Sequence, residues 1–268
     1  MGIADDFIGP LDQHWTQVLA GGAYAEIKNS VLRLGYTKAT PDNYTDAQID
    51  DYTMLGRKAY LWRPPLRMTV RARFSHNAAT ASATEATKNV LRGTAGFGFW
   101  NKPFTMQGNW FTLPQAVWFF YSAPPSNMAL VSGVPGWGWK AQVINTTAAG
   151  AALHALPAAL SAGYGRLVDT QPRGKALQRF AGAYEKIITD PMKDWHTYVL
   201  EWREHEASFW VDDTLLYEAP TAPTKPLGFV AWLDNEYAVV TPRGELQFGK
   251  IGSTMQWLDV ESINIIDL

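Results

Sequence analysis

Hydrophobic and polar residues alternate with a period of two along much of this chain. In residues 66–74 (LRMTVRARF) every second side chain is apolar, and Arg or Thr occupies the positions between them. Residues 195–218 (WHTYVLEWREHEASFWVDDTLLYE) contain three strand-like pieces separated by short polar turns. Side chains of a strand point alternately to its two faces, so this pattern predicts antiparallel strands with one buried face. Residues 195–218 are therefore predicted to form a β-meander.

Other stretches of the chain depart from this simple alternation. Residues 116–122 (AVWFFYS) contain no charged residue, which is typical of a strand buried on both faces. Residues 93–100 (GTAGFGFW) continue as a strand instead of opening a helix, so a dinucleotide-binding loop is not expected. Their glycines are expected to mark a bulge or the close approach of another backbone or a ligand. Residues 37–51 are polar and are predicted to form a surface loop.

One region has helical periodicity. Within residues 146–190 apolar side chains recur at helical spacing, namely Leu177, Phe180, Ala181, Tyr184, Ile187 and Ile188. This spacing predicts an amphipathic helix that ends before Pro191. We therefore expect one domain over residues 1–268, an all-β antiparallel jelly-roll sandwich with a helical insertion at 146–190, because sandwiches of this length are commonly single domains.

Composition restricts the classes of function. Hydrophobic residues make up 47% of the chain, enough for a full core, and the net charge of -2 gives no basic field to attract nucleic acid. Cysteine is absent, which excludes disulfides, zinc–thiolate sites and thiol nucleophiles. No apolar run is long enough to span a membrane. Residues 1–12 lack a signal-peptide pattern, so we expect a cytoplasmic protein or the mature form of a secreted one.

Aromatic residues are numerous, with 12 Trp, 11 Tyr and 12 Phe. Some are needed for the core, and others are expected to line a cleft that stacks on sugar rings or holds an apolar ligand. Four aromatic residues in or beside predicted strands are the candidates for ligand contact: Trp100, Trp118, Tyr121 and Trp232.

The meander and the end of the chain (LDVESINII) resemble the concanavalin A-like lectin and glucanase superfamily, in particular glycoside hydrolase family 16. That family has a W-H-x-Y-x-x-x-W strand followed by a strand with V-D-G. The matching residues here are Trp195, His196, Tyr198, Trp202, Val211 and Asp212, with Asp213 in place of the glycine. The resemblance covers residues 190–268 and, loosely, the N-terminal segment. It implies a jelly-roll sandwich with a concave face, in which His196 and Asp212 support the fold.

The resemblance does not extend to the family's catalytic motif. Retaining glycosidases need two carboxylates about 5 Å apart, and family 16 places them on one strand as E-x-D-x-x-E. No such triplet occurs in this sequence, and the strand expected to carry it by order, residues 115–122, contains no acid. The sequence therefore leaves open whether the protein is an enzyme.

Other acidic residues are candidates for chemistry or for metal binding. Asp234 and Glu236 lie two apart on a predicted strand, so they are expected to share a face and are the candidate acid and base. Asn235 is a candidate hydrogen-bonding partner for sugar hydroxyls. Structural calcium is the one cofactor considered, with carboxylate ligands on the convex side of the sandwich. Its candidate ligands are Asp5, Asp6 and Asp259.

Two functions stand as alternatives. The first is a carbohydrate-binding or carbohydrate-active protein whose aromatic concave cleft holds a glycan. The second is a binder, or an isomerase- or cyclase-like enzyme, for an apolar small molecule enclosed by the central aromatics and the 146–190 insertion. The family resemblance favours the first, whereas the missing catalytic triplet and the apolar residues 117–121 favour the second.

Overall fold

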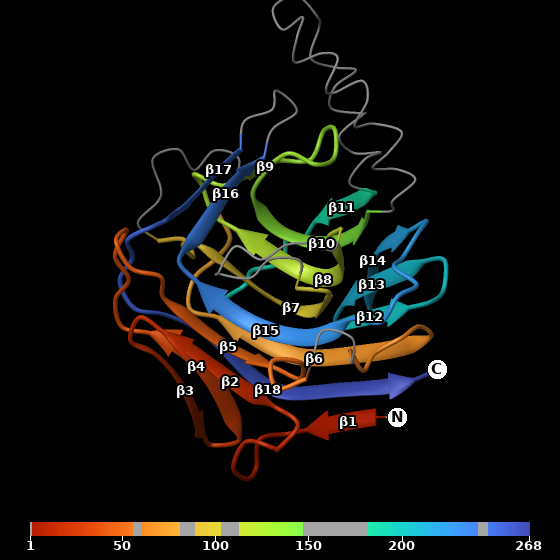
Figure 1. Cartoon of the computed structure of the whole chain (residues 1–268), viewed down its shortest axis with the longest axis horizontal. Helices are drawn as coiled ribbons and strands as arrows, with labels where there is room; N and C mark the ends of the chain where they lie inside the picture. Colours follow the sequence, from red (N-terminus) through yellow and green to blue (C-terminus); the bar gives the residue numbers. More distant parts are fainter. Residues whose placement is uncertain (1, 56–59, 81–88, 103–112, 147–181, 241–245) are drawn as a thin grey trace, which may run out of the picture.

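The computed structural model describes residues 2–55, 60–80, 89–102, 113–146, 182–240 and 246–268. Two large sheets pack face to face, and a small third sheet lies beside them (Figure 1). The described residues contain no helix, and so none that is long and apolar enough to cross a membrane. The prediction of an all-β antiparallel sandwich is confirmed.

The first large sheet has eight strands in the order β14-β13-β12-β6-β18-β4-β3, with β1 paired to β18. All of its pairs are antiparallel. The strands are β14 (Thr214–Ala219), β13 (Ala207–Val211), β12 (His196–Trp202), β6 (Leu66–Phe74), β18 (Gln256–Asp267), β4 (Val31–Tyr36), β3 (Ala23–Lys28) and β1 (Gly2–Asp5).

The second large sheet has seven strands in the order β11-β10-β8-β7-β15-β5-β2 and is also antiparallel throughout. It contains β11 (Ala183–Ile187), β10 (Gly138–Asn145), β8 (Gln115–Ser122), β7 (Thr94–Trp100), β15 (Gly228–Asp234), β5 (Asp46–Asp50) and β2 (Thr16–Ala20).

The small sheet continues directly from the second large sheet, because β16 begins two residues after β15 ends. Its order is β17-β16-β9, with β16 antiparallel to β17 and parallel to β9. It is built from β17 (Leu246–Lys250), β16 (Glu236–Val240) and β9 (Asn127–Met128).

The main core lies between the two large sheets. Every second side chain of β6 points into it, which confirms the alternation seen in residues 66–74. From the opposite sheet Phe97, Phe119 and Phe229 pack into the same core. Strand β8 is buried along its whole length, as its uninterrupted apolar sequence predicts. The glycines of β7 confirm a close approach: a Cβ at Gly98 (φ +144°) would lie 2.6 Å from Trp118 Cα.

The meander of residues 195–218 folds as predicted into β12, β13 and β14. Asp212 sits in the turn between β13 and β14 with a positive φ of 53°. Its carboxylate accepts the Thr197 backbone N–H at 2.9 Å and contacts His196 Nδ1 at 2.9 Å. These two residues therefore tie the meander together, as the family resemblance implies.

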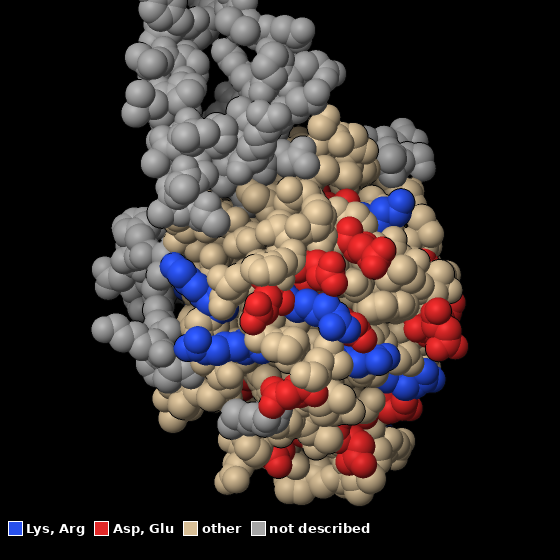
Figure 2. Space-filling view, turned by 90° about the vertical axis from the view of Figure 1, so that its right-hand side faces the viewer, with Lys and Arg blue, Asp and Glu red and all other residues tan. Residues whose placement is uncertain are grey.

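Charges of both signs are mixed on the surface. Figure 2 shows Lys and Arg side chains interleaved with Asp and Glu on one side of the molecule. Pairs across neighbouring strands of the eight-stranded sheet follow the same arrangement, such as Arg71 with Glu261 at 2.5 Å and Arg67 with Glu201 at 3.6 Å.

Two sequence predictions are wrong. Residues 183–187, assigned to the end of a helix, form β11 at the edge of the seven-stranded sheet, where Glu185 pairs with Gln142. Sheet pairing overrides the helical spacing there; residues 147–181 of that insertion lie outside the described residues. The other error is the surface loop at 37–51, because residues 46–50 form β5 between two neighbours. That residues 1–268 form one domain stays a prediction.

Candidate functional site

The seven-stranded sheet carries a second aromatic cluster on the face turned away from the main core. The cluster includes Tyr52, Trp118, Phe120 and Trp232, and Trp100 packs against it. We call this surface the aromatic face. Alternation along β8 and β15 produces it, because Phe119 and Leu233 enter the main core while their neighbours point outward.

Three of the four predicted ligand-contact aromatics meet on this face. Ring centroids lie 5.8 Å apart for Trp100 and Trp118, and 5.2 Å apart for Trp118 and Trp232. Trp118 and Trp232 are only 8% and 7% exposed, whereas Trp100 is partly exposed. Trp100 is therefore the member of the three best placed to offer ring surface to a ligand.

Each indole N–H is fixed by a polar partner. Trp100 Nε1 donates to the Tyr52 hydroxyl at 2.7 Å, and Trp118 Nε1 donates to Gln142 Oε1 at 2.6 Å. Trp232 Nε1 donates to Thr94 Oγ1 at 3.0 Å. These hydrogen bonds hold the rings in set orientations. Thr94, the partner of Trp232, also donates a hydrogen bond to the carboxylate of Asp234.

A cluster of acids lies at the end of the aromatic face where β15 ends. Asp234 is two residues beyond Trp232 and so points to the same side, and it is directly opposite Asp46 of β5. Its carboxylate accepts hydrogen bonds from Thr94 Oγ1 at 2.9 Å and from the Thr94 N–H at 3.1 Å. The Glu236 N–H adds a third at 2.9 Å. We call Asp46, Asp234 and Glu236 the acid cluster.

The acid cluster binds protons tightly. Burial raises the pKa of Asp234 to about 7, with a further contribution from the negative charge of Glu236. Burial, and then the neighbouring Asp234, raises the pKa of Asp46 well above its ordinary value. Oδ1 of Asp46 has no hydrogen-bond partner among the described residues. Strongly raised pKa values of buried acids cluster at functional sites, so the acid cluster is the candidate site for chemistry.

Glu236 differs from the two aspartates in its surroundings. It starts β16 and is only partly buried. Burial raises its pKa, and the positive charge of Lys250 partly offsets that effect. The prediction that Asp234 and Glu236 share one strand is wrong, since the chain changes sheets between them. The Glu236 backbone N–H still donates to Asp234. Asp234 is buried, whereas Glu236 is partly exposed.

A second polar group lies across the same face on β10 and β11. Lys140 Nζ contacts Glu185 Oε2 at 3.1 Å, and both side chains are almost fully buried. Gln142 donates to the other Glu185 oxygen and accepts from Trp118 Nε1. Burial lowers the pKa of Lys140 and raises that of Glu185, and their mutual attraction opposes both effects. This group is internally paired, in contrast to the acid cluster.

Two predicted ligand-contact residues do not belong to the site. Tyr121 points into the main core, where its hydroxyl donates to Leu91 O at 2.7 Å, because odd-numbered positions of β8 face inward. Asn235 is fully buried, and its side chain forms hydrogen bonds with residues of the loop that precedes β5. Its Nδ2 donates to Thr40 O and Asn43 O at 3.0 Å, and its Oδ1 accepts from Thr45 N–H at 2.9 Å.

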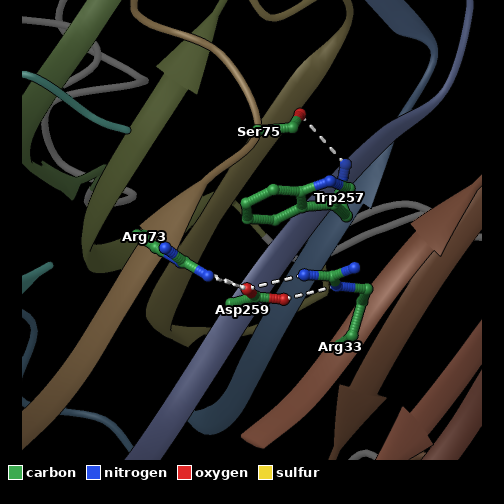
Figure 3. A network of polar contacts seen from close by, with 5 residues as sticks. All are labelled: Arg33, Arg73, Ser75, Trp257 and Asp259. Carbon is green, nitrogen blue, oxygen red and sulfur yellow. Dashed lines mark hydrogen bonds and ion pairs between the residues drawn. The ribbon is translucent and has the colours of Figure 1, made fainter. Parts of the chain in front are cut away.

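The candidate calcium ligands Asp5 and Asp6, which are neighbours in sequence, lie apart from Asp259. Asp5 accepts from Trp15 Nε1 at 2.9 Å and lies opposite Ile263, four residues along β18 from Asp259. Figure 3 shows Asp259 held between two guanidinium groups, with Nε of Arg33 at 2.6 Å and Nη2 of Arg73 at 3.1 Å. Two cations against one carboxylate do not fit a calcium site.

The described residues contain no group of three or more His, Cys, Asp or Glu side chains arranged to hold a metal ion. Structural calcium therefore stays a prediction without a supporting site in the described part of the chain.

Sequence reasoning missed Asp46 and Thr94. Both signals were present locally, because residues 46–50 (DAQID) alternate polar and apolar and Thr94 starts a strand. What the sequence does not contain is the register that places Asp46 and Thr94 on either side of Asp234. That register joins strands almost 200 residues apart in the chain.

Comparison with known proteins supports the fold. The family model for glycosyl hydrolases family 16 matches residues 173–231, a minority of the chain. A search of curated proteins finds no match to this sequence.

Solved structures match over nearly the whole chain at low identity. One comes from work on endo-acting O-glycanases of the human gut microbiota (TM-score 0.53, 12% identity, 99% of this chain and 98% of that one). Another is a β-1,3-1,4-glucanase (lichenase) from a mouse hindgut metagenome (0.51, 15%, 100% and 99%). A third is a glycoside hydrolase family protein from Mycobacterium thermorestibile (0.53, 13%, 98% and 99%). The fold is thus a concanavalin A-like sandwich of the family 16 type.

Proposed function

We propose that this protein is carbohydrate-active and takes a glycan across the aromatic face, with Asp234 as the proton donor and Glu236 as its partner base. The observation that carries the proposal is the buried carboxyl of Asp234, which has a pKa of about 7. It lies near the indole ring of Trp232 on the outward face of the seven-stranded sheet. A carboxyl with this pKa keeps its proton near neutral pH and can give it to a leaving oxygen.

The surroundings of Asp234 support this role. Thr94 and the backbone N–H of Glu236 hold the carboxyl in one orientation. Glu236 is the more accessible acid, so it is the one we assign to contact water or the sugar. Trp100 is a partly exposed ring on this face and is assigned to stacking, with Trp118 packed against it. Stacking on a tryptophan ring fits the apolar face of a sugar.

The test uses substrates drawn from the structural neighbours, namely mixed-linkage β-glucan and mucin O-glycans. Release of reducing ends and binding by calorimetry are measured in parallel. Asp234→Asn should lower kcat/KM by about 100-fold or more while leaving binding in place, and the wild-type rate should fall as pH rises through about 7. Trp100→Ala should weaken binding by about tenfold.

Asp213→Asn, in an exposed turn, is the matched control and should change neither quantity. Full activity of Asp234→Asn would overturn the assignment of the proton donor. Absence of binding to every glycan tested would overturn the proposed substrate class.

A second function is favoured by one specific observation. The rings of Trp118 and Phe120 stack on each other, with centroids 5.2 Å apart and an interplanar angle of 20°, within a cluster made of apolar and aromatic side chains. A face of this kind also suits an apolar small molecule, bound or transformed by the acid cluster. Binding of a lipophilic dye that is abolished by Trp118→Ala, without binding of any glycan, would favour this second function.

A further inference from the structure

Strand β5 places a glutamine on the aromatic face. The outward positions of this strand are Asp46, Gln48 and Asp50, because the two residues between them point into the main core. Gln48 is directly opposite Trp232 of β15 and lies two residues along β5, roughly 7 Å, from Asp46 of the acid cluster. Its side chain is partly exposed. Gln48 therefore stands between the aromatic rings and the acids, at a place that solvent reaches.

A buried carboxylate fixes the orientation of the Gln48 amide. Gln48 Nε2 donates to Asp50 Oδ2 at 2.6 Å. Asp50 is itself held, because its Oδ1 accepts the backbone N–H groups of Tyr52 at 3.0 Å and of Thr53 at 2.6 Å. Its Oδ2 also accepts the Thr53 hydroxyl at 2.7 Å. A carboxylate only accepts hydrogen bonds, so the amide nitrogen must face it. The carbonyl oxygen of Gln48 is thereby directed away from Asp50.

The Gln48 carbonyl oxygen is free to accept a hydrogen bond. No described residue donates to it, and unlike Oδ1 of Asp46 it is not among the buried side-chain oxygens without a partner, so it is open to solvent. The Trp232 indole leans the other way, over β7. Its Nε1 donates to Thr94, and a Cβ at Gly96 would lie 3.0 Å from its Cη2. An accessible acceptor with a set direction thus borders the proposed glycan site.

The surroundings of Gln48 favour a neutral sugar with a free hydroxyl. Carboxyl groups lie on both sides of it, at Asp46 and Asp50, and no Lys or Arg in the described part of the chain forms an ion pair with either. A sulfate or carboxylate on the ligand would lose water without gaining a counter-charge. A methyl ether would set one acceptor oxygen against another, whereas a hydroxyl can donate its proton.

We propose that Gln48 Oε1 accepts a hydrogen bond from one hydroxyl of the glycan, so that the site selects a neutral sugar in which this hydroxyl carries no substituent. Asp50 is a positioning residue, which acts by holding the amide. The inference rests on the proposed function, because it assigns a further contact to the same glycan. A site built to bind a hydroxyl rejects analogues that lack it, because its own polar group is then left unpaired.

The test uses mixed-linkage β-glucan oligosaccharides in which one hydroxyl at a time is replaced by hydrogen or by a methyl ether. Calorimetry measures their binding to the full chain. For the wild type, the change at one hydroxyl position should weaken binding by about tenfold or more, as expected for one lost hydrogen bond. Gln48→Leu should weaken the parent oligosaccharide by about tenfold. The variant should show no further loss at that hydroxyl, because the contact is already absent.

Asp50→Asn separates positioning from a purely structural role. The two backbone N–H groups at Oδ1 should keep the carbonyl oxygen of the new amide in that place, so its NH2 group faces Gln48. The Gln48 amide should then turn round and present its own NH2 group outward. This variant should lose most of the wild-type preference for the free hydroxyl over the methyl ether, because an N–H can donate to an ether oxygen. A purely structural role would weaken all ligands alike.

A glutamine on the neighbouring strand provides the matched control. Gln17 is exposed on β2 opposite Ile49, which points into the main core, so it does not belong to the aromatic face. Gln17→Leu should change none of these values. Thermal unfolding checks that each variant is folded, and Gln48→Leu decides the test by itself if Asp50→Asn is not.

Two results would overturn the inference and leave the proposed function standing. They are equal binding of every derivative by the wild type, and undiminished binding of the parent oligosaccharide by Gln48→Leu. A wild type that binds no β-glucan oligosaccharide would also overturn the inference. If it binds no mucin O-glycan either, the proposed function falls with it.

Discussion

Asp234 and Asp259 are two buried aspartates in opposite electrostatic surroundings. They are 6% and 1% exposed and lie on the outward faces of the two large sheets. Asp259 is clamped by Arg33 and Arg73 (Figure 3), whereas Asp234 lies beside Asp46 and Glu236, and no Lys or Arg in the described residues forms an ion pair with it. One carboxylate is neutralised by cations and the other by its own proton.

The difference separates an acid that stabilises the fold from the acid that we propose as functional. A buried carboxylate between two guanidinium groups fastens β18 to β4 and β6, and each hydrogen bond to a charged group contributes to stability. A buried carboxyl among other acids lowers stability where it is ionised, because the neighbouring negative charges repel it. Burial alone would have ranked the two residues equally.

The largest expected effect is the pH dependence of stability caused by Asp234. Its pKa is about 7 in the folded protein and about 3.8 when unfolded, so the folded state holds the proton more tightly. Stability from this group is complete below pH ~4 and is lost as pH rises through about 7, a loss of about 4 kcal/mol at ~1.36 kcal/mol per pKa unit. Urea denaturation at pH 5 and pH 8 measures the part of this loss that falls above pH 5, about 3 kcal/mol, because the carboxyl of the unfolded chain is already ionised at pH 5.

In Asp234→Asn this loss should be smaller, because the amide does not ionise. Part of the dependence should remain, since burial also raises the pKa of Asp51 to about 7. An unchanged difference between pH 5 and pH 8 in the variant would contradict the electrostatic account of the acid cluster.

Removing the other aspartate should destabilise the protein through the loss of two ion pairs. Asp259→Ala leaves Arg33 and Arg73 facing each other without a counter-charge, and we expect a loss of about 2–3 kcal/mol in the free energy of unfolding. The value is below that of a fully buried pair because each arginine is about a third exposed. Glu261→Ala, which breaks an exposed pair with Arg71, is the control and should cost under about 1 kcal/mol.

The smallest effect concerns the ring beside the arginine clamp. Arg33 Cζ lies 4.3 Å from the centre of the Trp257 ring, a cation–π contact. Trp257→Phe keeps a weaker version of it, so stability should fall by about 0.5 kcal/mol. The midpoint of urea denaturation should shift while its slope stays constant. A loss as large as that of Asp259→Ala would mean that the ring, and not the carboxylate, holds the clamp together.

Much of the architecture follows from local patterns. Alternation predicted β6 and the β12–β14 meander, and the uncharged run predicted the buried strand β8. These predictions succeeded because a strand's side-chain direction repeats every two residues whatever the strand pairs with. The predicted helix failed at residues 183–187, where pairing with β10 and the Lys140–Glu185 contact outweigh helical spacing.

Only part of the candidate site was predicted from the sequence. Trp100, Trp118, Trp232, Asp234 and Glu236 were predicted from their types and positions, and the structure gathers them at one face. The prediction for Tyr121 is wrong because neighbouring residues of a strand point to opposite faces, and Tyr121 points into the main core. The prediction for Asn235 is wrong because its hydrogen-bond partners, such as Thr40, are distant in sequence. Asp46 is part of the acid cluster because β5 pairs with β15, which the sequence does not predict.

The sequence by itself determined the class of fold, the absence of cysteine chemistry and the lack of the E-x-D-x-x-E triplet, since each depends only on residue types and their spacing. Tertiary structure alone decided which acids are paired with cations and which are left together. Charge interactions depend on distance through space, and sheet register brings Asp46 to Asp234 and Arg33 to Asp259 across 188 and 226 residues of chain.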